Sequence, residues 1–287
     1  MPESVPVDAW PYGSHAPGAL DRFALALTRA MPNNWLGLRL AMLFRRIVTM
    51  RLGRGALDTQ LWGMRLRLYA LGNGCEKNAL FTPQMFDVME RGILADAIGR
   101  KCDGFSFIDI GANVGLYSLF VASRASDVRI LAIEPQPGIL DRLRFNLAAN
   151  PGVKVDVLPM ALADREGTVE LVLDTSDSGG THIETATRSE AGVSVSVPCR
   201  PLISVLRDAG IASIDALKID VECAEDVVLV PFFRDAPRGL FPELVLIEDT
   251  RGFWQTDVFA LLDSTATLSW RAIARTWRTG ARPRAWR

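Results

Sequence analysis

The chain has 287 residues, of which 49% are hydrophobic and 23% are charged. This length and composition allow one sizeable buried core and exclude wholesale disorder. The net charge of -1 conceals an uneven distribution, because residues 1–70 carry nine arginines against four acids and residues 271–287 carry six arginines and no acid. Both ends are therefore basic, and the middle of the chain is acidic.

The cysteines and histidines argue against a structural zinc site. The four cysteines are widely scattered without Cys-x-x-Cys spacing, and the chain has only two histidines. The N-terminus lacks the basic-then-apolar order of a secretory signal. The apolar stretch at 35–50 is interrupted by Arg39, Arg45 and Arg46, so it does not suit a bilayer span. We therefore expect a cytoplasmic protein with reduced thiols.

Residues 1–80 predict an accessory segment that is mainly helical. Residues 1–18 are rich in proline and glycine, which is typical of a loose arm. Residues 20–54 have helical periodicity with a break at Pro32. Residues 60–71 alternate between apolar and polar positions, which predicts one strand.

Arginines flank an apolar stripe in the second half of this helical region. The stripe contains Leu38, Met42 and Leu43. Such a stripe can be buried against protein or can lie on an anionic membrane. Because it is short and Pro32 interrupts the segment, we expect it to pack on the main domain, with weak peripheral lipid contact through the basic ends as the secondary role.

The main domain is expected over residues 81–265, with a C-terminal strand and an Arg/Trp-rich tail over 266–287. A helix is predicted at 85–98, and strands then alternate with helices from Phe105 onward. Residues 168–173 and 193–198 predict an antiparallel insertion around a polar loop. The alternation indicates an α/β fold, a Rossmann-like doubly wound and mainly parallel sheet with an N-terminal helical extension.

The strongest motif lies between the first strand of this domain and the next helix. It reads Asp109-Ile-Gly111-Ala-Asn113-Val-Gly115. It is not a phosphate-binding loop, because no lysine follows, and its spacing departs from Gly-x-Gly-x-x-Gly. A glycine turn with an acid before it suits the amino-acid end of S-adenosylmethionine better than a pyrophosphate, although a tight strand–helix turn without a ligand is the alternative.

Glu134 strengthens the ligand interpretation. It ends the second strand, 25 residues after Asp109. A carboxylate at that place can accept hydrogen bonds from both ribose hydroxyls of a nucleoside. The alternative is an acid that merely ends a strand at the surface.

Four sequence blocks, in order, resemble the FkbM-type methyltransferases. They are FIDIGANVGLYSL, AIEPQPGILDRLRFNLAAN, ALADREGTVEL and LKIDVECAE, and the resemblance covers roughly residues 80–250. It implies a class I methyltransferase that uses S-adenosylmethionine and acts on a hydroxyl of a sugar, a polyketide or a similar small metabolite. The motif positions that it places around the methionine moiety are Asp109, Gly111, Asn113 and Gly115.

The resemblance also assigns the nucleoside end of the site. Glu134 falls at the ribose-binding acid, and Asp164 falls where the adenine edge is expected, with a role in a turn as the alternative. The chain departs from the family at Cys223, where the pattern has a glycine. This departure puts the local geometry of the acceptor side in doubt.

Asp220 is the leading candidate for the acceptor side, because it ends the strand that faces the transferring methyl group in this architecture. A hydroxyl is a poor nucleophile and needs a base or a metal ion nearby. We expect Asp220 to act as base or orienter without a metal, together with Lys218. An ion pair that only ties the strand end is one alternative. A magnesium ion held by Asp220 with Glu248 or Asp249 is another.

His182 lies in the polar loop of the insertion and is a candidate general base, because an imidazole titrates near neutral pH. A merely exposed histidine is the alternative. Nucleic acid is not the expected partner, although the basic ends keep an RNA methyltransferase open. A dinucleotide-dependent oxidoreductase and a non-catalytic cofactor-binding module are the other competing classes.

Overall fold

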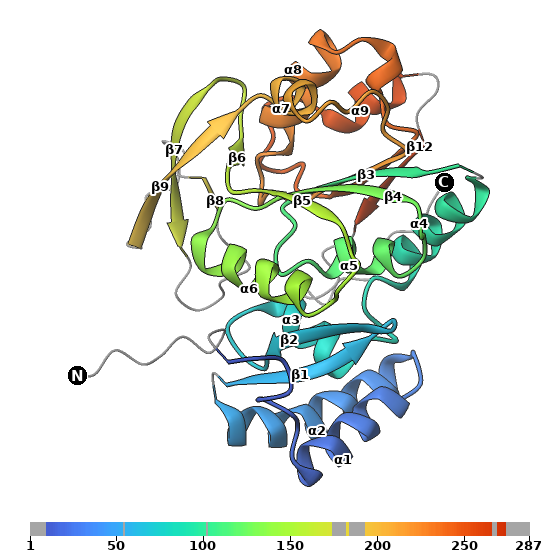
Figure 1. Cartoon of the computed structure of the whole chain (residues 1–287), viewed down its shortest axis with the longest axis vertical. Coiled ribbons are helices and arrows are strands. Elements are labelled where there is room, and N and C mark those ends of the chain that lie inside the picture. Colours follow the sequence, from blue (N-terminus) through green and yellow to red (C-terminus); the bar gives the residue numbers. More distant parts are fainter. Residues whose placement is uncertain are drawn as a thin grey trace.

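A six-stranded parallel sheet forms the centre of the molecule in the computed structural model, which describes residues 10–53, 55–101, 103–173, 182–183, 193–265 and 269–273 (Figure 1). In sequence order along the chain, the strands occupy sheet positions 3-2-1-4-5-6, the Rossmann order. This confirms the predicted Rossmann-like α/β fold. The strands, from one edge to the other, are β12 (Ser269–Ile273), β11 (Leu244–Glu248), β10 (Ala216–Ile219), β3 (Phe105–Ile110), β4 (Val128–Ile133) and β5 (Val155–Leu158).

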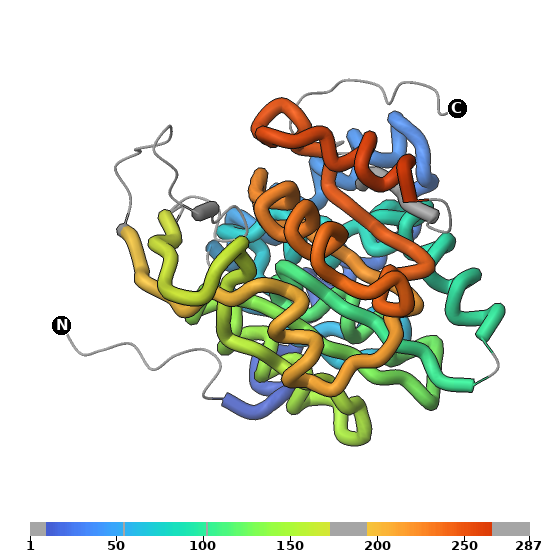
Figure 2. The backbone as a smooth tube through the Cα atoms, turned by 90° about the horizontal axis from the view of Figure 1, so that it is seen from above, coloured from blue at the N-terminus to red at the C-terminus, as the bar shows by residue number. Residues whose placement is uncertain are grey.

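Helices cover both faces of this sheet, because successive side chains of each strand point to opposite faces and both sets are apolar. Phe107 of β3 joins the core on one face, and Ile108 joins the core on the other. Figures 1 and 2 show the helices of the orange-to-red part of the chain over the upper face. These are α7 (Leu202–Asp208), α8 (Glu225–Asp235) and α9 (Val258–Asp263). The lower face carries α4 (Val88–Arg100), α5 (Leu116–Ala122) and α6 (Pro137–Ala148).

A small second sheet carries the predicted insertion. Its strand order is β6-β9-β7-β8, and β7 pairs antiparallel with β9 from Gly167↔Cys199 to Leu173↔Val193. The antiparallel pairing of the insertion is therefore confirmed. The bounds of these strands are β6 (Ala161–Leu162), β7 (Gly167–Leu173), β8 (His182–Ile183) and β9 (Val193–Arg200).

The N-terminal region contains a β-hairpin where the sequence predicted one strand. The hairpin consists of β1 (Ala56–Leu61) and β2 (Met64–Tyr69), which pair antiparallel around Trp62-Gly63. Trp62 and Gly63 both have positive φ, 54° and 82°, as a tight two-residue hairpin turn requires. The single-strand prediction was wrong because the apolar alternation continues across the turn.

Two helices lie on the outer side of this hairpin, α1 (Ala19–Ala30) and α2 (Trp35–Leu52) (Figure 1). The predicted helical region and its break near Pro32 are confirmed. The predicted packing face is wrong, because Met42 and Leu43 are exposed. The helix instead buries Gly37, Ala41 and Val48, small or short side chains that let the helices approach closely.

A buried ion pair fastens part of the predicted loose arm to the hairpin. The Arg67 guanidinium donates to Asp58 Oδ1 at 2.7 Å and to the carbonyl oxygens of Trp10 and Pro11 at 2.8 and 2.9 Å. Asp58 also accepts the backbone N–H of Gly13 at 2.6 Å. Because Arg67 is almost fully buried, these charge-assisted bonds hold the described part of the arm in place.

The N-terminal layer shares one hydrophobic core with the lower face of the main sheet. Leu25 of α1, Val48 of α2 and Leu68 of β2 belong to the same buried cluster as Phe107. Residue 80, the predicted boundary, lies inside α3 (Gly74–Phe81). Residues 274–287, which hold most of the Arg/Trp-rich tail, lie outside the described residues. Among those described, no helix is both long and apolar enough to cross a membrane.

Candidate functional site

The turn after β3 requires a glycine at position 111. Gly111 has a φ of 69°, and its N–H donates to the carbonyl oxygen of Ile133 on β4 at 3.0 Å. A Cβ at this position would overlap the carbonyl oxygen of Asp220, which follows β10. The missing side chain therefore lets the turn touch the ends of both neighbouring strands.

Asp109 lies buried behind this turn. Its Oδ2 accepts the hydroxyl of Ser118 at 2.6 Å, and its Oδ1 lies 3.8 Å from Lys218 Nζ. Burial raises the pKa of Asp109, and the lysine charge offsets part of this rise. The parallel register places Lys218 of β10 directly opposite Asp109, so the pair follows from the sheet itself.

Lys218 connects three groups at the strand ends. Its Nζ donates to the carbonyl oxygen of Gly111 at 2.8 Å and lies 3.7 Å from Asp220 Oδ2. Burial opposes the lysine charge, but the carboxylates of Asp220 and Asp109 raise its pKa above the ordinary value. Lys218 is therefore a buried cation that holds the glycine turn and Asp220 together.

Glu134 follows β4 and faces the same turn. Its two carboxylate oxygens accept the N–H groups of Asn113 and Gln136 at 2.9 and 3.0 Å. Burial raises the pKa of Glu134 to about 7, although both N–H bonds favour the charged form. A carboxylate accepts up to about four hydrogen bonds, so capacity remains for a ligand.

A cavity of about 870 Å³, measured to its open mouth, joins these residues. Of the predicted site residues, those in the lining are Gly111, Asn113, Glu134 and Asp220.

The other predicted residues are placed differently. Asp109 and Lys218 lie behind the cavity wall, and Gly115 begins α5. Asp164 has a half-exposed side chain that pairs with Arg165 at 3.1 Å; it is not among the lining residues but follows Leu162, which is. His182 pairs through its backbone with Val172 of β7, and its side chain lies outside the described residues.

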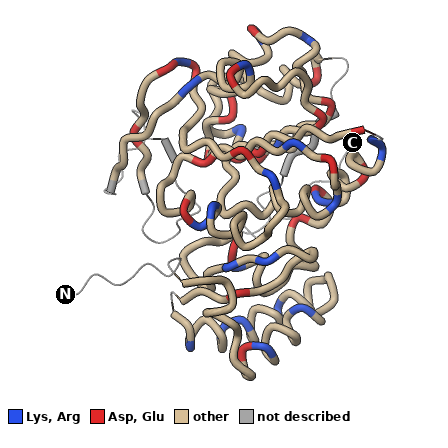
Figure 3. The backbone as a smooth tube through the Cα atoms, in the orientation of Figure 1, with Lys and Arg blue, Asp and Glu red and all other residues tan. Residues whose placement is uncertain are grey.

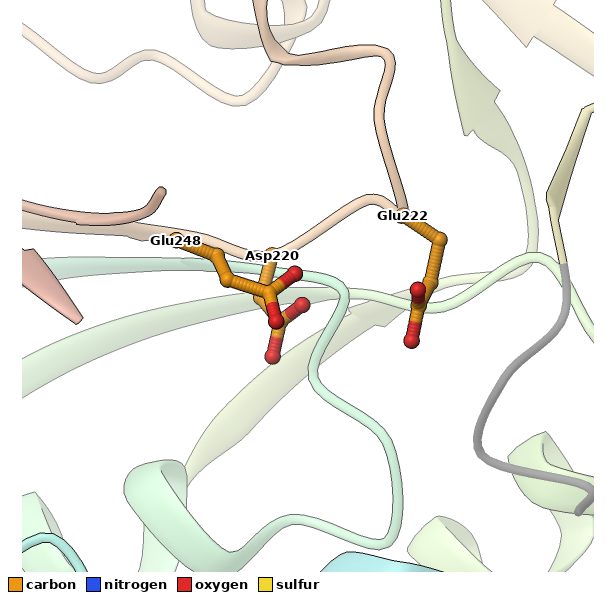
Figure 4. A group of neighbouring side chains, drawn as sticks. All are labelled: Asp220, Glu222 and Glu248. Atoms are coloured by element: carbon orange, nitrogen blue, oxygen red, sulfur yellow. The ribbon is translucent and has the colours of Figure 1, made fainter. Parts of the chain in front are cut away.

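Three carboxylates meet at one end of the cavity. Asp220, Glu222 and Glu248 each offer an oxygen, and these atoms lie within 4.8 Å of one another (Figure 4). This spacing is compatible with a divalent cation, which prefers carboxylate oxygens. Asp249, the other predicted ligand, instead pairs with Arg251 at 2.8 Å.

The departure from the family pattern has a visible structural consequence. Cys223, which stands where the pattern has a glycine, adopts a φ of 82°. Glu222 beside it has a φ of 52°, so two consecutive residues with side chains occupy the left-handed region. The turn keeps the backbone of a glycine and therefore carries strain.

Sequence reasoning missed the part of the site that α3 supplies. Asn73 caps α3 and donates from its side-chain amide to Asn113 Oδ1 at 2.9 Å, and Cys75 lines the cavity. Glu76 is buried and pairs with Arg142 of α6 at 2.7 Å. The Asn73-x-x-Glu76 spacing, typical of a helix N-terminus, was the available signal, because the sequence predicted only a turn there.

The strand order, the glycine turn after β3 and the acid after β4 define the class of this protein. It is a Rossmann-like α/β protein with a cavity beyond the carboxyl ends of its strands. The Methyltransferase FkbM domain matches residues 109–260, so the chain belongs to the FkbM methyltransferase family. It is therefore a methyltransferase of the kind that depends on S-adenosylmethionine.

Two curated proteins and one solved structure are similar to this chain. The chain is 29% identical over 204 residues to methyltransferase sdnD of Sordaria araneosa, covering 54% of this chain and 79% of sdnD. It is 30% identical over 181 residues to AMB antimetabolite synthetase AmbE of Pseudomonas aeruginosa, covering 50% of this chain but only 8% of AmbE. A SAM-dependent methyltransferase from Agrobacterium tumefaciens is 10% identical, with a TM-score of 0.39 over 76% of this chain and 61% of that one.

Proposed function

We propose that this protein transfers a methyl group from S-adenosylmethionine to a hydroxyl of a sugar, a polyketide or another small metabolite in the cytoplasm. The observation that carries the proposal is the position of Asp220. Its carboxylate lines the same cavity as Glu134 and Gly111, so an acceptor and a nucleoside can share one chamber. A hydroxyl acceptor needs a group that takes its proton, and a carboxylate at this end can do so.

The residues at the other end of the cavity fit S-adenosylmethionine. Buried Glu134 keeps free acceptor capacity for two ribose hydroxyls, beside the turn of Gly111 and Asn113. Gln136 also lines the cavity, and its Oε1 is buried without a hydrogen-bond partner among the described residues. Unpaired buried acceptors favour a ligand that brings hydroxyl or amino donors. When bound, the sulfonium group supplies an electrophilic methyl carbon to the acceptor.

Each acceptor-side residue has a distinct proposed role. Asp220 orients the acceptor hydroxyl and accepts its proton. Lys218 is too firmly protonated to be a base, because nearby carboxylates raise its pKa. Its ammonium group lies 3.7 Å from the Asp220 carboxylate and holds it against the glycine turn. His182 remains a proposed general base from the insertion, and Asp164 a proposed contact at the adenine edge.

A magnesium-dependent mechanism is the second candidate, and the three-carboxylate cluster favours it. An ion held by Asp220, Glu222 and Glu248 would bind the acceptor oxygen and lower its pKa. Under this mechanism Asp220 is a ligand and not a base. The two mechanisms share the same residue and differ in their requirement for metal.

A radiolabelled methyl-transfer screen against sugars, polyketides, lipids and RNA tests the proposed function. We expect label in a hydroxyl-bearing small metabolite, with turnover strongly reduced by Asp220→Asn. Asp249→Asn is the matched control, because its side chain is 32% exposed against 30% for Asp220 yet pairs with Arg251. Label only in RNA would make the protein an RNA methyltransferase. Cofactor binding without any acceptor would indicate a non-catalytic module.

A further inference from the structure

Helix α2 points its large apolar side chains away from the protein. Five of them follow the helical spacing of four and three residues and are exposed, with 61% exposure at Leu43 and 75% at Met50. We call this row the α2 stripe; it consists of Leu36, Leu40, Leu43, Ile47 and Met50. A helix on a globular protein ordinarily turns such a row inward, so the stripe needs an external partner.

Helix α1 repeats this inverted arrangement. Phe23 is 62% exposed and Leu20 is also exposed, whereas Asp21, Ala24 and Thr28 are buried. Apart from Leu25 and Val48, which join the core, the side chains that the two helices bury are small or polar, and several large apolar ones are exposed. The pair lies at the far end of the molecule from α7, α8 and α9 (Figure 1).

The charges around the α2 stripe have one sign. The helix contains no acid, and Arg39 and Arg46 are exposed beside the stripe. Asp21, the acid in α1, is buried and pairs with Arg51 at 3.5 Å. Figure 3 shows this Lys/Arg colouring along the two lowest helices. An apolar row bordered by arginine complements a surface that is apolar inside and anionic outside.

We propose that the α2 stripe docks on an anionic lipid surface. The stripe would enter the boundary between headgroups and acyl chains, while Arg39 and Arg46 meet lipid phosphates or carboxylates. Trp35, with the Arg39 guanidinium 5.2 Å from its ring centroid, supplies an aromatic side chain suited to the interface.

A second copy of the chain fits this face less well. A two-fold contact through α2 would bring the same arginines of both copies together, and the helix offers no acid to pair with them. The proposal concerns only where the protein resides and is independent of the methyl acceptor.

Sedimentation of the full chain with lipid vesicles tests the proposal, using phosphatidylcholine alone and phosphatidylcholine mixed with phosphatidylserine. We expect binding to the mixed vesicles that weakens with added salt. Arg39→Gln/Arg46→Gln should weaken it about 25-fold, about fivefold for each arginine. Leu43→Gln/Met50→Gln should weaken it at least about tenfold, and glutamine preserves helix propensity.

The matched control is Val88→Gln/Met89→Gln on α4. Val88 and Met89 are also exposed apolar residues, with Met89 at the same 61% as Leu43, and their replacement should leave vesicle binding unchanged. Failure of the wild-type chain to bind mixed vesicles would overturn the proposal. Equal losses in the α4 and α2 variants would also overturn it. So would a dimer in light scattering that Leu43→Gln/Met50→Gln dissolves without any lipid binding, since α2 would then join two copies.

Discussion

Acidification should weaken cofactor binding through Glu134. The carboxylate is buried, and its pKa is raised to about 7 in the protein without ligand. If the ionised form accepts the ribose hydroxyls, lowering the pH from about 8 to about 6 replaces most of that form by the neutral acid. Each hydrogen bond to a charged group contributes about 1.5–3 kcal/mol, so two of them favour the ionised form strongly.

The expected magnitude follows from the ionised fraction. One pH unit below a pKa of about 7, roughly a tenth of the carboxylates remain ionised, so the Kd for S-adenosylhomocysteine should rise about tenfold. Isothermal titration calorimetry at the two pH values measures this change. Glu134→Gln should bind S-adenosylhomocysteine weakly and with the same Kd at both pH values, because its amide does not titrate. A wild-type Kd that is the same at both pH values would refute the reasoning.

The stability of the ligand-free protein should change in the opposite direction. The folded pKa of Glu134, about 7, exceeds its ordinary value of 4.5. Protonation of Glu134 therefore stabilises the folded protein, by on the order of 3 kcal/mol. This contribution is fully present below about pH 4.5 and is lost as the pH rises through about 7. The melting temperature of the wild type relative to Glu134→Gln should rise on acidification, while the shift caused by ligand shrinks.

Three further changes test the acceptor side. Lys218→Met leaves Asp109 and Asp220 without their buried cation. It should lower the free energy of unfolding, measured by urea titration, by about 3–5 kcal/mol. A loss below about 1 kcal/mol would contradict the view that these buried ion pairs stabilise the fold. A chelator should leave turnover intact if Asp220 acts without metal, whereas loss in EDTA that magnesium reverses would select the metal mechanism. Cys223→Gly should raise the free energy of unfolding by about 1 kcal/mol, because glycine adopts a φ of 82° without strain. A lower free energy of unfolding would show that the contacts of the thiol stabilise the fold by more than the backbone strain destabilises it.

Local patterns in the sequence were enough to predict the main sheet and to bring the glycine turn and Glu134 to one cavity. The glycine turn and Glu134 each follow a buried strand directly, and the carboxyl ends of parallel strands meet at one edge. The order of the strands along the chain is therefore enough to place the glycine turn next to Glu134. The strained turn at Cys223 could also be anticipated, since its position in the motif calls for a glycine backbone.

The other end of the cavity depended on tertiary structure, because its residues come from separate segments. The strand ends suggested Asp220 with Glu248, but no local pattern adds Glu222 to them or places Cys75 of α3 beside Asp220. The burial of Lys218 likewise follows from the register of two strands more than a hundred residues apart in sequence.

The sequence by itself determined most of the segments that become helices and strands, because periodicity and turn residues act over a few positions, but it did not reveal α3. It could not separate β1 from β2, since the apolar alternation runs through Trp62. Nor could it orient α2: periodicity reveals an apolar row but not what the row faces. Packing decided that, because α2 buries Gly37, Ala41 and Val48 on one side and leaves Leu43 and Met50 exposed on the other.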